Sequence, residues 1–353
     1  MVSANFQFSM VTKYSYIDST GKNVIDASGY ESAGNFSERL AAVLDRRKGW
    51  GFIDKTGAFV IPPKFESALG FSEGLAAVLL DNKWGFINKN GILVIDHQFD
   101  WVAEFSEGVA VVQRSLTPPK SNAPPPTESH KTGVSVITEV WNLLDDDNLK
   151  PGHEHTEFMI IDAAGQILAV LDRTKVEVNI DYATFSEGLL CAYSPEKDAM
   201  GYVNKSGDFV IEPKFAEASP FSEGLARVAV LENGMEKLAF INHKGDFVIP
   251  PGFNTDFDFR RNSSGFSEGL AAISEGLNPS RTKEARFIYI DKSGKIVLAT
   301  EFSYAGEFRD GLAVVYSDRT NRWGFIGKTG KVVIPLQYQL ANDFSDGLAL
   351  VGR

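Results

Sequence analysis

One hexapeptide recurs along the whole chain and constrains its fold more than any other feature. The pattern is Phe-Ser-Glu-Gly-Leu-Ala or a close variant, and its eight phenylalanines are Phe36, Phe71, Phe105, Phe185, Phe221, Phe266, Phe308 and Phe344. Their spacings are 35, 34, 80, 36, 45, 42 and 36 residues, so one unit takes about 35 residues and the long spacing marks a unit with an insertion. Such a period indicates a repeat architecture, in which each unit buries its apolar side against its neighbours.

A second motif, aromatic-Gly-aromatic-Ile-Asp-Lys-x-Gly, also occurs eight times. Its clearest copies start at Trp50, Trp84 and Trp323, and weaker copies start at Tyr14, Phe158, Met200, Leu238 and Phe287. A Val-Ile-Pro-Pro-like stretch often follows it, as after Phe59. The β-branched and aromatic runs have strand length, and no window shows a long amphipathic helix pattern. We therefore predict an all-β protein in which the Asp-Lys-x-Gly segment is a hairpin turn, the glycine after tryptophan admits a neighbouring backbone, and the proline pair after Ile61 ends its strand.

These three motifs resemble those of the WG-repeat (KWG) family of bacterial repeat proteins. The resemblance runs from about Tyr14 to Leu350, although only three of the eight units keep the Trp-Gly pair itself. It implies an interaction or scaffold module without a defined chemistry.

The order of the motifs bears on whether the repeats close into a ring. The chain starts with the aromatic motif and ends with the hexapeptide, so its two ends are half-units. In a β-propeller, terminal half-units complete one blade and remove exposed sheet edges. We expect a closed propeller of eight blades in a single domain, 1–353. Because about 35 residues is short for a propeller blade, an open β-hairpin solenoid is the alternative.

Composition excludes several classes of function. The net charge of −11 disfavours nucleic acid and anionic membranes as partners. No stretch is long and apolar enough for direct membrane insertion, and Cys191 is the only cysteine and occupies a small-residue position of the repeat, so we expect a cytoplasmic protein without a disulfide. His153 and His155 are too few for a metal site, and no nucleophile or phosphate-binding motif occurs. We expect no cofactor, no metal and no enzymatic activity.

One insertion, residues 115–157 in the third repeat, interrupts the period. It is proline-rich at its start and acidic at its end. Because insertions in repeat proteins often carry the binding face, we expect a partner protein to contact Trp141, Leu143, Leu144, Asp145, Asp146 and Asp147. Trp101, outside the repeated tryptophan position, is a second expected contact if exposed. The alternative is a tolerated loop that folds back on its own blade.

Eight acidic residues share one repeat position: Glu38, Glu73, Glu107, Glu187, Glu223, Glu268, Asp310 and Asp346. In a closed ring they could bind cations or a basic partner. The favoured interpretation is turn chemistry, with each acid paired to a lysine of the neighbouring unit such as Lys55 or Lys89.

Together these features predict a non-catalytic scaffold for protein–protein interaction, such as a subunit or linker of a larger assembly, that uses one rim and the insertion. A small-ligand or glycan-binding propeller is the alternative function.

Overall fold

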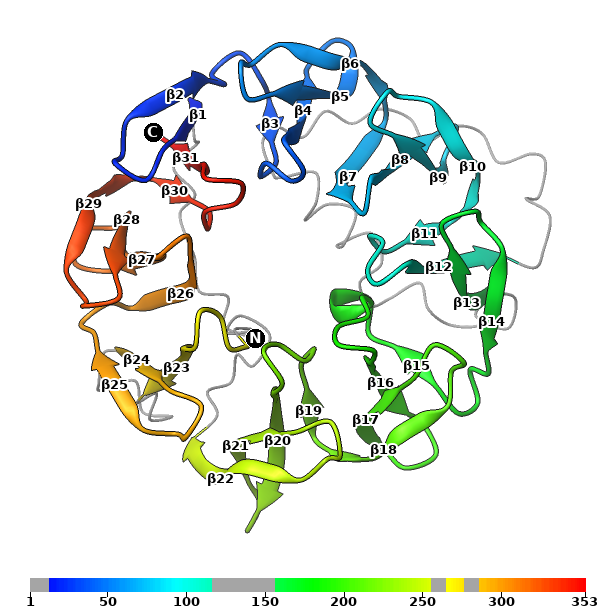
Figure 1. Ribbon diagram of the computed structural model, residues 1–353, viewed down its shortest axis with the longest axis vertical. Coiled ribbons are helices and arrows are strands. Elements are labelled where there is room, and N and C mark those ends of the chain that lie inside the picture. Colours follow the sequence, from blue (N-terminus) through cyan, green and yellow to red (C-terminus); the bar gives the residue numbers. More distant parts are fainter. Residues whose placement is uncertain (1–12, 116–155, 255–264, 276–285) are drawn as a thin grey trace.

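The chain folds into eight small antiparallel sheets around a common axis, which is a β-propeller (Figure 1). The computed structural model describes residues 13–115, 156–254, 265–275 and 286–353. In this part of the chain seven blades have four strands and one has three. The ring predicted from the half-units is confirmed, and the open solenoid is excluded.

Seven blades take consecutive strands, and the inner strand of each four-stranded blade lies nearest the axis. The first three blades are β3 (Ser32–Ala33), β4 (Leu40–Asp45), β5 (Gly49–Asp54), β6 (Phe59–Phe65); β7 (Ser67–Ser72), β8 (Leu75–Leu80), β9 (Lys83–Asn88), β10 (Leu93–Phe99); and β11 (Trp101–Val102), β12 (Val109–Ser115), β13 (Thr156–Asp162), β14 (Ile167–Leu171).

Four further blades follow along the chain. They are β15 (Glu177–Val178), β16 (Leu190–Ser194), β17 (Ala199–Val203), β18 (Phe209–Phe215), with a 3-10 turn η2 (Ile180–Tyr182) between β15 and β16; β19 (Glu217–Ala218), β20 (Ala226–Glu232), β21 (Met235–Ile241), β22 (Phe247–Asn254); β23 (Ala271–Glu275), β24 (Arg286–Ile290), β25 (Ile296–Ala299); and β26 (Tyr304–Arg309), β27 (Leu312–Ser317), β28 (Arg322–Gly327), β29 (Val332–Tyr338).

The eighth blade closes the ring with strands from both ends of the chain. Its order is β2 (Asn23–Asp26), β1 (Tyr14–Ile17), β31 (Ala349–Gly352), β30 (Leu340–Ala341). β1 and β31 pair antiparallel from Tyr14 opposite Gly352 to Ile17 opposite Ala349. The two predicted half-units therefore complete one blade between them.

The hydrophobic core lies between blades. Each hexapeptide phenylalanine is buried. Seven of the eight pack edge-on or tilted against the aromatic ring of the preceding blade's third strand (β1 in the closing blade), with centroids 4.8 to 5.0 Å apart, and the pairs are Tyr16–Phe36, Phe52–Phe71, Phe86–Phe105, Tyr202–Phe221, Phe240–Phe266, Tyr289–Phe308 and Phe325–Phe344. Since seven blades supply such a ring to the next blade, the core of a blade is completed by its neighbour.

The glycine after tryptophan admits the backbone of the outer strand, as predicted. A Cβ built on Gly51 would lie 2.7 Å from both the Ile61 carbonyl oxygen and the Pro63 nitrogen. Gly85, Gly201 and Gly324 meet the same close approach. In each of these blades the register shifts beside the glycine, which marks a β-bulge of the outer strand.

The prediction that the proline pair ends its strand is wrong. β6 continues through Pro62 and Pro63 to Phe65. An outer edge strand needs no N–H on its solvent side, and the bulge removes a further ladder bond, so both prolines are tolerated.

Where Ser15, Met159 and Ile288 replace the glycine, the outer strand pairs regularly at that point. Ala239 also replaces it, but there the register still shifts. The bulged outer strand therefore occurs together with glycine or alanine at this position, and the larger residues occur with regular pairing.

We expect Gly51→Val to lower the free energy of unfolding by about 2 kcal/mol, because the new side chain meets backbone that cannot move without breaking the bulge. Ser15→Val, at the same repeat position in a regularly paired blade, is the matched control and should change stability by less than about 0.5 kcal/mol. Chemical denaturation followed by tryptophan fluorescence measures both. Equal effects would contradict the proposed steric role of the glycine.

Candidate functional site

The hexapeptide forms a tight hairpin between the first and second strands of each blade. Glu73 and Gly74 both have positive φ, 53° and 82°. Ser37 and Leu40, which flank the turn of another blade, exchange backbone hydrogen bonds of 2.9 and 3.0 Å. This is the geometry of a two-residue type I′ turn, in which glycine fits the second position without strain.

Each turn is tied to the next by its acidic side chain. The carboxylate accepts a hydrogen bond from the backbone N–H at the glycine position of the following turn, over 2.6 to 3.3 Å. The acceptor and donor residues are Glu38 and Gly74, Glu73 and Gly108, Glu107 and Gly188, Glu187 and Gly224, Glu223 and Gly269, Glu268 and Gly311, Asp310 and Gly347, and Asp346 and Arg39. The last pair closes a complete circle, which we call the turn ring.

Serine hydroxyls add a second set of links. Ser37 Oγ donates to the Phe71 carbonyl oxygen of the next turn at 2.6 Å, and Ser72, Ser106, Ser186, Ser222 and Ser267 do the same at 2.5 to 2.6 Å. Each of these hydrogen bonds links one turn to the next, as the expected turn chemistry predicts.

Basic side chains of the Asp-Lys-x-Gly turns neutralise most of the turn ring. Lys89 Nζ lies 2.9 Å from Glu38 Oε2, and Lys205, Lys292 and Lys328 reach their acids in the same way. Lys55 donates to the carbonyl oxygen of Asp346. The predicted pairing of Lys89 with a turn acid is confirmed. Lys55 contacts the backbone carbonyl of Asp346 and not its carboxylate.

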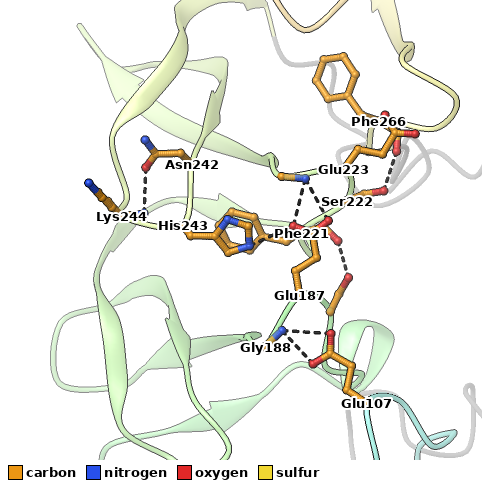
Figure 2. A network of polar contacts seen from close by, with 12 residues as sticks. Glu107, Glu187, Gly188, Phe221, Ser222, Glu223, Asn242, His243, Lys244 and Phe266 are labelled. Atoms are coloured by element: carbon orange, nitrogen blue, oxygen red, sulfur yellow. Dashed lines mark hydrogen bonds and ion pairs between the residues drawn. The ribbon is translucent and has the colours of Figure 1, made fainter.

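Histidine replaces lysine in one blade. Figure 2 shows His243 beside Glu187, with Nε2 3.0 Å from Oε2, and its ring stacked on Phe221 with centroids 4.3 Å apart. The same view shows Glu107 bonded to Gly188, so the ring continues through this substitution.

Two blades lack a basic residue at this position. Ala163 stands there in the turn before β14, and Ser19 in the turn before β2. The acids that would receive the missing cations are Glu73 and Asp310, and neither pairs with a cation among the residues described. Asp346 belongs with them, because Lys55 contacts its backbone carbonyl oxygen, so within the described ranges three carboxylates of the turn ring have no ion pair.

The hydrogen bonds also alter the acidity of Glu268. Partial burial would raise the pKa of Glu268, but the Gly311 N–H and Lys328 stabilise its carboxylate and bring the pKa below its ordinary value. The acids of the turn ring therefore serve structure, and their repetition offers no unique catalytic arrangement.

A set of charged residues that breaks the repeat lies on and beside the inner strands, and we call Arg227, Glu307, Arg309 and Asp343 the axial cluster. Arg309 Nη2 pairs with Glu307 Oε2 at 2.9 Å. Arg227 is 3% exposed, and burial lowers its pKa to about 10 although Tyr182 and Glu307 favour its charge. Burial raises the pKa of Asp343 to about 6, against the effect of Arg309, and its Oδ1 accepts no hydrogen bond from the described residues.

The outer strands carry a belt of exposed apolar side chains. In every blade the side chain three positions after the turn glycine is valine or leucine, and it is 43 to 52% exposed. These residues are Val24, Val60, Val94, Leu168, Val210, Val248, Val297 and Val333, and we call them the outer belt. Of the large apolar side chains that are exposed in the described residues, all except Leu231 and Met235 lie on an outer strand or directly before one.

The outer belt was not predicted from the sequence. A recurrent apolar pair before the buried isoleucine, as in Phe59-Val60-Ile61, indicates a strand but does not show which of its faces is covered. An alternating pattern would have shown the exposed side, but consecutive apolar residues conceal it.

The structure places few of the predicted contact residues. Trp141, Leu143, Leu144, Asp145, Asp146 and Asp147 lie outside the described residues. Trp101 is half-buried on β11, with its ring 6.1 Å from that of Phe158, so it is less exposed than expected.

The expected bounds of the insertion need a correction. Ser115 pairs with Thr156 and Arg114 with Glu157, so both ends of the range 115–157 belong to regular strands. The pairing extends β12 and β13 because their side chains still alternate along the ladder.

Other sequence expectations concern reactive groups. Cys191 is fully buried, and burial raises the pKa of its thiol to about 12, in keeping with a packing role. His153 and His155 lie outside the described residues. Within the described ranges, no group of three or more His, Cys, Asp or Glu side chains could hold a metal ion, and no helix is long and apolar enough to cross a membrane.

Comparison with known families gives one match. A family model described as "WG containing repeat" matches residues 14–47, 50–84, 84–114, 200–231, 239–276, 289–318 and 323–352. No curated protein sequence matches the chain significantly.

Solved structures with similar folds are distant in sequence. A structure from a study of two prolyl endopeptidases has a TM-score of 0.52 at 10% identity, over 93% of this chain and 49% of that one. The computationally designed Ika8 protein has a TM-score of 0.47 at 12% identity, over 88% and 86%. The β-propeller domain of the Trilobed protease from Pyrococcus furiosus has a TM-score of 0.42 at 11% identity, over 78% and 86%. These similarities concern the fold alone.

We expect Ala163→Lys to stabilise the protein by about 0.5 kcal/mol, because it supplies the missing cation to Glu73. Thermal melting at low ionic strength measures the gain. Ala164→Lys, one residue further along the same turn, is the control and should give no gain. The gain should disappear in the double variant with Glu73→Gln, and a gain that persists there would contradict the pairing.

We expect Asp343→Asn to make stability less dependent on pH. The folded-state pKa near 6 lies above the ordinary 3.8, so the folded protein binds the proton more tightly and loses stability as pH rises through this interval. The variant should gain up to about 2 kcal/mol on the wild type between about pH 4 and pH 7, measured by chemical denaturation. Asp96→Asn, on the solvent side of β10, is the control, and an equal gain there would contradict the assignment.

Proposed function

Because the chain belongs to the WG-repeat family and closes its repeats into a β-propeller, we propose that it is a non-catalytic scaffold that binds other proteins through the outer belt. The observation that supports this best is the recurrence of one exposed apolar residue at the same place in all eight blades. In six blades folding alone does not require it, because the isoleucine beside it is buried and already fills the space between blades.

The belt also suits a scaffold because it is distributed. Eight equivalent surfaces around a ring could hold several partner segments at once or one long segment. The partners we propose are proteins, since apolar side chains on strands match apolar side chains of another chain and offer no recognition for phosphate backbones.

The alternative of a glycan-binding propeller has less support. Glycan sites commonly stack sugars on exposed aromatic rings, yet Trp50 and Trp84 are buried between blades. Trp101 and Trp323 are half-buried. Hydrolysis by paired carboxylates is also less favoured, because the recurrent acids are engaged in the turn ring.

A belt variant tests the proposal. Each of the eight outer-belt residues is replaced by Thr, which keeps strand propensity while adding a hydroxyl to the apolar surface. The wild type and the variant are used to capture proteins from the native host, and each captured protein is purified and titrated against both. We expect the variant to fold and to bind at least about tenfold more weakly.

Controls separate the belt from charge and from the insertion. Lys22, Lys295 and Lys331, exposed directly before outer strands, are replaced by Thr and should leave affinity unchanged. A second control replaces residues 116–155 by a short Gly-Ser linker, which leaves the Ser115–Thr156 pairing intact. Partners that bind the belt variant normally but not the linker variant would refute the belt and favour the insertion.

A further inference from the structure

Each blade ends in an outer strand with an unpaired edge, and most of these edges carry a residue that blocks further pairing. The position five residues after the glycine of the Asp-Lys-x-Gly turn lies on the outer strand and is exposed in every blade. Six blades place proline or an acid there, namely Asp26, Pro62, Asp96, Glu212, Pro250 and Pro335. Proline and charge are the means by which proteins prevent an edge strand from pairing with another chain.

Two outer strands lack this protection. β14 has Val170 at the position, and β25 has Ala299. β14 is the longer strand, and all five of its residues are apolar. Ile167, Leu168 and Val170 are 48, 52 and 55% exposed, so the exposed side chains of this strand are apolar.

β14, like β2 and β25, is also regular at the point where the five other outer strands are bulged. It pairs with β13 without a register shift from Phe158 to Ile160, and its register shifts between Ile160 and Ile161. As the last strand of its sheet it presents backbone N–H and C=O groups that no described strand pairs with. An apolar edge of this kind is a template for another strand.

The charges at the start of β14 differ from those of β25. The turn before β14 has Ala163 where lysine is usual, and none of the residues that the structure describes supplies a cation to Glu73 in its place. The turn before β25 keeps Lys292, which pairs with Glu223 at 3.1 Å. β14 therefore begins next to a vacant basic position, and β25 does not.

The repeat that contains β14 departs from the family pattern in other respects. It lies between the matched stretches 84–114 and 200–231 and belongs to neither. Its third strand has Ile160 where seven blades have an aromatic ring against the next phenylalanine. The same repeat thus combines an unprotected edge with the loss of the turn lysine, of the aromatic ring and of the match to the family model.

We propose that β14 takes up an extended apolar segment of a partner protein as an additional antiparallel strand, with a lysine or arginine at the C-terminal end of that segment. Antiparallel pairing brings the C-terminal end of the guest to the start of β14, where its basic side chain takes the place of the missing ring lysine. A second copy of this chain fits less well, because each copy carries a net charge of −11. This inference rests on the proposed function and assigns one partner contact to one strand.

The test uses the full chain and a fluorescent peptide, acetyl-Thr-Val-Thr-Val-Thr-Val-Lys-amide, in anisotropy titrations. Val170→Asp and Val170→Pro introduce the protecting residues of other blades, and Ala299→Asp is the matched control on β25. We expect saturable binding that both Val170 variants weaken at least about tenfold, while the control binds as the wild type does. Two different substitutions at Val170, each checked by thermal melting, guard against a folding defect in one of them.

The basic residue is tested separately. Ala163→Lys places a lysine at the position that lacks one, and it should weaken binding of the peptide that ends in lysine. A peptide that ends in Glu should bind the wild type more weakly than the lysine peptide does. Equal binding of both peptides would overturn the charge assignment.

Other results would overturn the inference as a whole. No binding to the wild type, or equal binding by the Val170 variants, excludes β14 as the edge. A dimer in sedimentation velocity that Val170→Asp dissociates would make a second copy the occupant. If host partners are lost by the belt variant but retained by the Val170 variants, the scaffold function stands and the assignment to β14 fails; if both retain them, both proposals fail.

Discussion

The hydrogen bond that each turn carboxylate accepts from the backbone N–H of the next turn is the interaction on which the ring depends. It connects neighbouring blades at eight places, including the junction of Asp346 with Arg39. A buried aromatic pair fixes the spacing between most blades, while the carboxylate bond fixes how the turns are aligned. Because each unit gives one such bond and receives one, a blade cannot be changed without affecting its two neighbours.

Much of the fold could be predicted from the sequence because the repeat is regular and its ends are incomplete. The half-units beginning at Tyr14 and ending at Gly352 indicated closure, and the turn acids indicated pairing with Lys89. The strand through Pro62 and Pro63 could not be predicted from proline preferences, since tolerance of proline depends on the strand being an outer edge. That position in the sheet is a property of the assembled ring.

The candidate site was harder to predict for a related reason. Val60 and Ile61 are both apolar neighbours in sequence, yet one is exposed and the other is buried between blades. Only the ring shows which side of an outer strand is covered. Likewise, Val170 is an ordinary strand residue until it is aligned with Pro62 and Asp96, which protect the same edge in other blades. The informative comparison is between repeats of one chain.

The closing blade has a consequence for how the protein is made. The contacts within seven blades join residues near in sequence, whereas Arg39 and Asp346 are 307 positions apart. During synthesis, early blades can therefore form hairpins and stack while the ring is still open. The first blade keeps an uncovered side until the final strand emerges from the ribosome, and the last step of folding is then a single event that covers both ends of the stack at once.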